Sequence, residues 1–449
     1  MKKAVLIFIL FLASKAQAQD FWTQYSTAQT AQGTGVRSIS IVDENVTWLN
    51  MESGASTQSS IRRFSKTLDG GFVWASAEID LGSDAPNLEI ANISGTSASE
   101  AYAAVFPTTS NVLGGIWKTI DGGVHWNRQN SADFSDESSY PNLVHFWNQN
   151  QGVAMGDPAG GYFEIYTTTN GGANWSRVAI SEALIPLATD EYGIRNKYTV
   201  TENTIWILTT YNRLLKSSDR GLTWTALSSP IPDFGGAMIN NETVDFAFTD
   251  QNNGILASEF NLYYTSDGGN SWFEHAWSGD FRDGSISSIP GLLHAYIVIG
   301  SDHIFQRGSS YTVDSGITWE PIYDSVPVDG NQISMFSLSH GFAGGYSESP
   351  LVGGIFKWNA TPCGCFAITD FTSKNPLKAF PNPTEKSLTV TGQNIQKIQV
   401  IDVLGKSVID HSYPQINQTE LDISSLEKGV YWLKVFEQEK PRSLKVIKL

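Results

Sequence analysis

The chain has 449 residues, a formal net charge of −16 and a pI near 4.8, and only 2 of its residues are cysteine. An acidic chain lacks the positive field that a phosphate backbone requires, so we expect no nucleic acid partner. Two cysteines exclude a disulfide scaffold and a Cys-rich zinc module. Aromatic residues make up 12% of the chain, enough for packed cores, which excludes a disordered protein.

The first 18 residues have the pattern of a secretory signal peptide. Two lysines precede an apolar run at 4–13 that is too short to span a bilayer. Ala16-Gln17-Ala18 then offers small residues for cleavage, so we expect the mature chain to begin near Gln19 or Asp20. We expect no transmembrane segment after signal removal. An uncleaved N-terminal anchor is the alternative.

An octamer recurs six times, with steps of 52, 49, 49, 48 and 47 residues between copies, and this spacing predicts a repeat architecture. The first copy is Thr67–Trp74, and every copy has Asp or Asn in its third position and Trp in its last. The third side chain can accept hydrogen bonds from turn amides, and the glycine that usually follows supplies a positive φ, so each copy predicts a β-hairpin turn. The Trp is predicted to pack between neighbouring units. The third-position residues are Asp69, Asp121, Asn170, Asp219, Asp267 and Asp314.

Each period also contains two earlier strand-like runs, such as 143–147 and 152–156 in the third, so four short strands per period predict a propeller blade. A seventh, degenerate unit ends at 353–358. Its missing last strand is found at the other end of the chain, where Trp22 takes the position of an octamer Trp. We therefore predict an all-β protein with a seven-bladed β-propeller over residues 19–360, closed by the mature N-terminus. A six-bladed ring is the alternative.

The octamer resembles the Asp-box, or BNR repeat, whose pattern is Ser/Thr-x-Asp-x-Gly-x-Thr-Trp, and the copies at 217–224 and 312–319 carry it in full. The resemblance covers residues 20–360 and implies a fold rather than an activity. Families with such repeats include sialidases, xyloglucanases, sortilin-type receptors and the photosystem II stability/assembly factor propellers. A single seven-bladed ring is most similar to the last family, which implies a role in assembling a membrane complex.

Composition changes after the ring. Residues 361–375 are predicted to be a linker, and their Cys363 and Cys365, with no histidine nearby, are too few ligands for a metal site. Two free thiols and a local disulfide both remain open. Residues 376–449 predict a small β-unit of about six strands, typical of an immunoglobulin-like β-sandwich. The expected strands are 387–391, 397–403, 407–411, 419–423, 430–436 and 443–449.

The C-terminal unit resembles the type A sorting domain of the Bacteroidetes type IX secretion system. It has the opening Pro-Asn-Pro motif, the central Gly-Lys turn, the late Lys-Gly-Val-Tyr motif and a basic terminal strand. The resemblance implies transport by the type IX machinery across the outer membrane, removal of the unit, and release or attachment at the cell surface. An accessory β-domain is the alternative. The motif residues are Pro381, Asn382, Pro383, Gly405, Lys406, Gly429 and Tyr431.

Candidate ligand-binding residues lie where the loop after the second strand of each repeat is expected to begin. Five of the six are acidic, and we expect them around the mouth of the channel on the face opposite the octamer turns. There they would bind a cation, a basic ligand or sugar hydroxyls; solvated loop ends are the alternative. These residues are Glu52, Asp157, Tyr211, Glu259, Asp302 and Glu348.

No catalytic signature accompanies them: the sequence has no Gly-x-Ser-x-Gly elbow, no His-Glu-x-x-His and no phosphate loop, and we predict no cofactor or metal. A glycoside hydrolase needs two carboxylates facing each other across a sugar, for which Asp157 with Glu259 or Asp302 with Glu52 are candidates. The arginines are too scattered for a sialidase. We therefore predict an exported, non-catalytic binding protein for glycans or other envelope components. The alternatives are a polysaccharide-active hydrolase and an assembly factor for a membrane-associated complex.

Overall fold

The computed structural model of the protein describes residues 21–29, 32–54, 61–136, 138–231, 244–302, 305–322, 328, 332–349, 351–359, 378–381, 383–402, 406–436 and 441–449. The chain divides into two compact units, Met1–Thr361 and Pro362–Leu449. Several sequence predictions fall outside the described residues: the signal peptide, the linker, Cys363, Cys365, Asn382 and Gly405.

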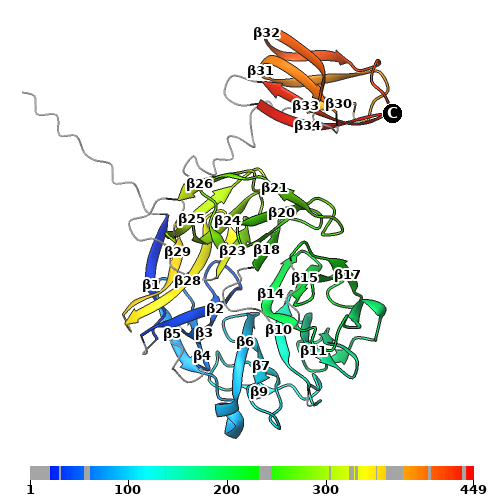
Figure 1. The fold of residues 1–449 in the computed structure, drawn as a ribbon. Coiled ribbons are helices and arrows are strands. Elements are labelled where there is room, and N and C mark those ends of the chain that lie inside the picture. Colours follow the sequence, from blue (N-terminus) through cyan, green and yellow to red (C-terminus); the bar gives the residue numbers. More distant parts are fainter. Residues whose placement is uncertain are drawn as a thin grey trace, which may run out of the picture. The chain divides into compact units, whose positions relative to one another are not determined.

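The first unit is a seven-bladed β-propeller (Figure 1), as the repeat predicts. In each of the first six blades the chain runs outward through four antiparallel strands. The short parallel strand β22 (Ser278–Gly279) is added at the outer edge of the sixth blade, next to β26. A single bridge between Gly35 and Tyr346 joins the sheets of the first and last blades.

The strands fall into four concentric sets. The innermost strands are β2 (Thr34–Ile41), β6 (Leu88–Gly95), β10 (Pro141–Phe146), β14 (Gly193–Thr201), β18 (Val244–Phe248), β23 (Asp283–Ser288) and β27 (Ile333–Ser337). The second strands are β3 (Thr47–Ser53), β7 (Ala101–Pro107), β11 (Gly152–Ala159), β15 (Thr204–Thr209), β19 (Gly254–Ser258), β24 (Tyr296–Ser301) and β28 (His340–Ser349). The third strands are β4 (Arg63–Thr67), β8 (Gly115–Thr119), β12 (Tyr162–Thr168), β16 (Arg213–Ser217), β20 (Asn261–Thr265), β25 (Arg307–Thr312) and β29 (Val352–Trp358). The outermost strands are β5 (Trp74–Glu78), β9 (Asn127–Arg128), β13 (Ser176–Arg177), β17 (Thr225–Ser228), β21 (Phe273–His275), β26 (Thr318–Ile322) and β1 (Trp22–Ser26).

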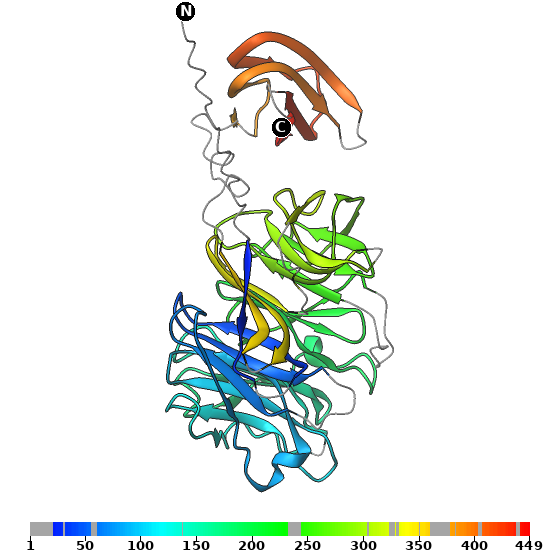
Figure 2. The ribbon, with the colours of Figure 1, turned by 90° about the vertical axis from the view of Figure 1, so that its left-hand side faces the viewer.

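The N-terminal strand closes the ring. Strand β1 pairs antiparallel with β29 of the last blade, with Trp22 opposite Trp358 (Figure 2). The indole of Trp22 is 3% exposed, lies edge-on to the Trp358 ring at 4.8 Å, and donates a 3.0 Å hydrogen bond to the Ser309 hydroxyl of the sixth blade. This closure confirms the seven-bladed prediction over the six-bladed alternative, and it removes a free sheet edge.

The hydrophobic core lies between the blades. Each apolar cluster draws its side chains from two adjacent sheets, and the octamer Trp residues contribute to them; Trp126, for example, packs on Trp48 and Phe64 of the preceding blade. Polar bonds repeat between blades as well. The Lys66 ammonium lies 4.5 Å from the Trp48 ring and donates a 2.9 Å hydrogen bond to the Gly122 carbonyl of the next blade, and Lys118 and Lys216 make the corresponding contacts further round the ring.

The six octamers form the turns between third and outermost strands, here called the Asp-box turns. In every one the third side chain accepts a hydrogen bond from a backbone amide three or four residues later and from the hydroxyl that opens the octamer. Asp219 shows the full set, since its second oxygen also accepts from the Thr223 hydroxyl at 2.6 Å. The next residue has a positive φ even where it is not glycine, as at Arg220 (60°) and Ser315 (64°).

In its described residues the second unit is an all-β, sandwich-like fold of five strands. They are β30 (Lys378–Phe380), β31 (Ser387–Ile401), β32 (Ser407–Asp422), β33 (Gly429–Phe436) and β34 (Pro441–Lys448). The count of six was wrong, because β31 and β32 each join two of the expected strands. Irregularities in their register at Thr391, Ile395 and Lys397 absorb the polar segment that suggests a break.

Candidate functional site

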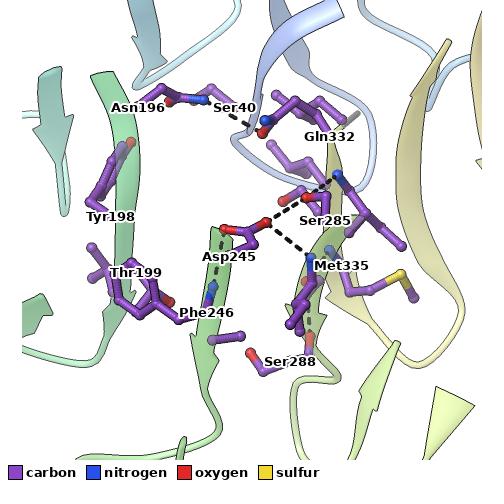
Figure 3. A pocket seen from close by; sticks show the side chains of 18 of the residues that line it. Ser40, Asn196, Tyr198, Thr199, Asp245, Phe246, Ser285, Ser288, Gln332 and Met335 are labelled. Carbon is purple, nitrogen blue, oxygen red and sulfur yellow. Dashed lines mark hydrogen bonds between the residues drawn. The ribbon is translucent and has the colours of Figure 1, made fainter. Parts of the chain in front are cut away.

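A cavity of about 290 Å³ lies at the axis of the propeller, and we call it the axial cavity. The inner strands of six blades line it, namely β2, β10, β14, β18, β23 and β27. It therefore belongs to the ring as a whole, since it exists only when the blades are assembled. Its wall is rich in hydroxyl and amide groups (Figure 3). The polar residues of the wall are Ser40, His145, Asn196, Tyr198, Thr199, Asp245, Ser285, Ser287, Ser288, Gln332 and Ser334.

Some of these groups already form hydrogen bonds between blades. The Ser285 hydroxyl donates to Asp245 at 2.8 Å and accepts from the Ile333 amide at 3.3 Å, so it connects three blades. The Ser287 hydroxyl accepts from the Met335 amide at 3.0 Å in the same way. Such side chains connect the axial edges of neighbouring inner strands.

Other polar groups of the wall remain available. Within the described residues, the hydroxyls of Thr199, Ser288 and Ser334 have no hydrogen-bond partner in the protein, although all three line the axial cavity. Figure 3 shows Thr199 and Ser288 among the side chains that line it. A half-buried hydroxyl without an internal partner can bind water or a polar ligand.

One side of the cavity is aromatic. The Tyr198 ring lies 5.7 Å from the imidazole of His145, and its hydroxyl receives a 3.3 Å hydrogen bond from the Asn92 amide of the second blade. Burial lowers the pKa of His145 to about 4, so the imidazole is neutral at physiological pH. Burial likewise raises the pKa of Tyr198 to about 12, so this wall carries no charge.

Asp245 is the carboxylate that lines the axial cavity, and both of its oxygens interact with other protein groups. One accepts from the Ser285 hydroxyl and the Ile286 amide, at 2.8 and 3.0 Å. The other lies 3.3 Å from the Lys197 ammonium. A carboxylate held by an ion pair and two donors is suited to fastening blades together and poorly suited to proton transfer.

The axial cavity is closed at one end by the side chains of Asn196 and Gln332. The Asn196 amide donates to the Arg37 carbonyl of the first blade at 3.0 Å and lies 3.5 Å from the Gln332 amide oxygen of the last. Asn196 reaches across because β14 is irregular between Gly193 and Tyr198 and gives Asn196 a φ of 56°, which Asn tolerates better than most residues.

A second cavity, of about 230 Å³, lies beyond these two side chains, which line both cavities. Val36, Arg37, Glu52 and Arg195 complete it. Arg37 and Glu52 form an ion pair of 3.2 Å. The guanidinium of Arg195 is exposed and lies 4.7 Å over the ring of Phe106.

The carboxylate of Asp157 anchors the irregular start of β14. It lies at an irregularity of β11 and accepts hydrogen bonds from the Asn142 amide at 2.6 Å and from the Gly193 backbone amide at 3.0 Å. Burial raises the pKa of Asp157 to about 7, against the opposing effect of these two donors and of the nearby Arg195. Asp157 therefore supports the residues that separate the two cavities.

The six residues that we predicted to gather at the channel mouth do not form one cluster. Glu52 lies within β3 and lines the second cavity, and Asp157 supports that region from β11. Neither cavity is lined by the other four. The Tyr211 hydroxyl donates to Asp190 at 2.5 Å, Asp302 accepts from the Gln306 amide in a turn at 2.8 Å, and Glu259 and Glu348 are exposed.

The same placement bears on the hydrolase alternative. Among the described residues, Glu52 and Asp245 are the carboxylates that line the cavities, and both are in ion pairs. Glu259, expected opposite Asp157, and Asp302, expected opposite Glu52, line neither cavity. Sequence reasoning also missed Asn196, Thr199, Ser288 and Ser334, because inner-strand serines, threonines and amides do not stand out from an ordinary strand pattern.

The C-terminal unit has a clear relative. Residues 378–449 match the family model of the secretion system C-terminal sorting domain. This sorting domain confirms the predicted transport by type IX secretion, and it indicates a protein delivered to the cell surface or the extracellular space. No helix in the described part of the chain is long and apolar enough to cross a membrane.

Of the motif residues that the structure describes, most lie at or beside strand ends, and Tyr431 lies within β33. The Lys406 amide donates to the Asp402 carboxylate at 3.0 Å where β31 turns into β32, and the Tyr431 hydroxyl donates to the Glu427 carbonyl at 2.9 Å. Gly429 begins β33, and Pro381 and Pro383 lie between β30 and β31.

Solved structures resemble the propeller. One is a YCF48 propeller bound to D1 peptide, with 15% identity, a TM-score of 0.51, and coverage of 77% of this chain and 98% of that one. Another is YCF48 from Cyanidioschyzon merolae, with 17% identity, a TM-score of 0.52, and coverage of 75% and 98%. They confirm the predicted likeness to photosystem II assembly factor propellers at the level of fold. A GH74 enzyme from Niastella koreensis matches at 11% identity over 90% of this chain and 65% of its own, but its TM-score of 0.24 carries no argument. A search of curated proteins finds no match.

Proposed function

We propose that the propeller is a non-catalytic recognition module that binds a glycan in its axial cavity after export by the sorting domain. The observation that carries this proposal is the set of available hydroxyls, from Thr199, Ser288 and Ser334, in a cavity at the axis of the ring. Small-molecule sites are concave and fix their ligands through a few convergent polar groups. Hydroxyls that both donate and accept match the chemistry of sugars.

The aromatic wall supports the same ligand class. Neutral rings such as those of Tyr198 and His145 offer an apolar face beside hydrogen-bonding groups, and a sugar ring presents the same combination. Delivery to the cell surface or beyond would bring the cavity within reach of envelope polysaccharides. The sorting domain supports this location, and the glycan itself remains our inference.

A binding role fits the carboxylates better than hydrolysis does. Glycoside hydrolases place two carboxyl groups roughly 5–10 Å apart on either side of the scissile bond, with one of them free to transfer a proton. Asp245 is held by Lys197 and Ser285, and Glu52 is held by Arg37, at the far side of Asn196. We therefore assign these carboxylates to structure.

The test is a glycan array followed by calorimetry on the full mature chain. Thr199→Val and Ser334→Ala each remove one available hydroxyl, and each is expected to weaken binding by about 3- to 10-fold, as for loss of one hydrogen bond. Ser181→Ala is the matched control, because Ser181 is exposed and makes no side-chain cap bond. Release of shortened sugars would show hydrolysis. Binding that neither variant weakens would place the site elsewhere.

A further inference from the structure

The axial cavity differs at its two ends. At the start of the inner strands it is closed by Asn196, whose amide bonds to the Arg37 carbonyl at 3.0 Å and contacts Gln332. Both side chains line the axial cavity and also the second cavity, so they form a partition between the two. Figure 3 shows them reaching toward each other. A ligand in the axial cavity cannot continue past this partition without displacing it.

The partition is built into the backbone. The irregular segment of β14 carries Asn196 at a φ of 56°, and the Asp157 carboxylate holds the start of that segment through the Gly193 amide at 3.0 Å. Three blades therefore contribute: the fourth supplies Asn196, the first supplies the Arg37 carbonyl, and the last supplies Gln332. Because the positive φ of Asn196 is a property of the backbone, a change of its side-chain rotamer would leave the irregular segment of β14 unchanged.

The other end of the axial cavity opens at the face of the propeller where the inner strands end. It is lined where the inner strands finish, by Ile41, Val200, Ser288 and Phe336, and the Phe336 side chain is 38% exposed. The Asp-box turns lie on this face, because their glycine amides bond to the hairpins that follow the inner strands, as Gly70 does to Asn45 at 2.9 Å. Entry is therefore from the face of the Asp-box turns.

We propose that the axial cavity is a blind site for the terminal sugar of a linear glycan, which enters from the face of the Asp-box turns. This inference rests on the proposed function. A volume of about 290 Å³ is at the lower edge of the roughly 300–1,000 Å³ typical of small-molecule sites, so it suits a chain end and not a long segment. The residues predicted from the sequence lie toward the opposite face, so this inference corrects that expectation.

The experiment measures how many protein molecules bind one glycan chain. The probes are short and long chains of four unbranched glycans: amylose, xylan, mannan and β-1,3-glucan. Each is titrated with the full mature protein by calorimetry and analytical ultracentrifugation. A site for chain ends predicts the same number of protein molecules per chain at both lengths, whereas a site for internal segments predicts a number that grows with length.

Asn196→Gly tests the partition, because glycine accepts the same positive φ without strain and removes the closing side chain. With the partition removed, a long chain can run through the axis, so the number of protein molecules bound per long chain is expected to rise above the wild-type value, and an unchanged number would refute the partition. Asn111→Gly is the matched control, since Asn111 is exposed and has a φ of 66°.

The outcomes separate the two proposals. A binding number that scales with chain length overturns recognition of chain ends and leaves glycan binding intact. No binding of any of the four glycans overturns the proposed function and this inference with it. If Asn196→Gly does not fold, the binding number of the wild-type protein decides alone.

Discussion

Removing the Trp22 indole tests the closure of the ring, because this side chain belongs to the first strand and packs on the last two blades. Trp22 is 3% exposed, contacts Trp358 at 4.8 Å and donates to Ser309 at 3.0 Å. Truncating a buried Trp to Ala costs about 3–5 kcal/mol, and loss of the ring pair and the hydrogen bond contributes within that range. We expect Trp22→Ala to destabilise the propeller by about 4 kcal/mol.

The assay is guanidinium unfolding of the full mature chain followed by tryptophan fluorescence. Of the 14 tryptophans only Trp432 lies in the sorting domain, so the signal reports on the propeller. Trp22→Phe keeps a ring against Trp358 and loses the donor to Ser309, and should cost about 1–2 kcal/mol. Trp432→Ala is the matched control, because this indole is 46% exposed. If Trp22→Ala unfolds within about 1 kcal/mol of the wild type, β1 does not hold the ring closed and the reasoning fails.

Three further predictions concern buried polar groups. Burial raises the pKa of Asp157 to about 7, so its contribution to stability is complete below its ordinary pKa of 3.8 and is lost as pH rises through about 7. Asp157→Asn should remove this part of the pH dependence of Tm. If the variant and the wild type show the same dependence of Tm on pH, the prediction is wrong. Glu191→Ala leaves the Arg213 guanidinium, 2.9 Å away, buried without its partner, and should cost about 3–5 kcal/mol in denaturant unfolding; a cost below about 1 kcal/mol would show that the pair is unimportant. Lys118→Met keeps the side-chain stem but removes the 2.8 Å hydrogen bond to the Gly171 carbonyl of the next blade. The free energy of unfolding, measured by thermal unfolding, is expected to fall by about 2 kcal/mol. An unchanged Tm would show that this bond does not stabilise the contact between the blades.

The fold could be predicted from the sequence because the same turn and strand pattern recurs in every repeat. Six turns with the same hydrogen-bonding side chain fix the blade length, and Trp22 identifies the strand that completes the last blade. The sorting domain was recognisable from its motifs. Its strand count was wrong, because a long strand with register irregularities near Ile395 looks the same in sequence as two strands separated by a turn.

The site could not be predicted in the same way, because it depends on a departure from the repeat. The inner strands β2, β6 and β10 also shift register once against their second strands, but the shift in β14 covers a longer segment, between Gly193 and Tyr198, and only this longer segment brings Asn196 across the axis. Asp157 is predicted as a ligand-binding residue because a loop is expected to begin there, but its carboxylate accepts a hydrogen bond from the Gly193 amide of the next blade. Aligning the repeats identifies residues that occupy the same position in each blade. The axial cavity is instead lined by residues that occupy different positions in different blades.

The pairing of β1 with β29 has a consequence for the order in which the molecule folds. Trp22 and Trp358 are neighbours in the sheet but lie at opposite ends of the propeller sequence, so this contact joins segments that are far apart along the chain. Contacts between distant segments form slowly, because a long loop must close before they can stabilise anything. A chain that is synthesised from its N-terminus must keep the first strand unpaired until the last blade has emerged. We expect the final closure of the ring, and with it the completion of the axial cavity, to be the slow step in folding of the propeller.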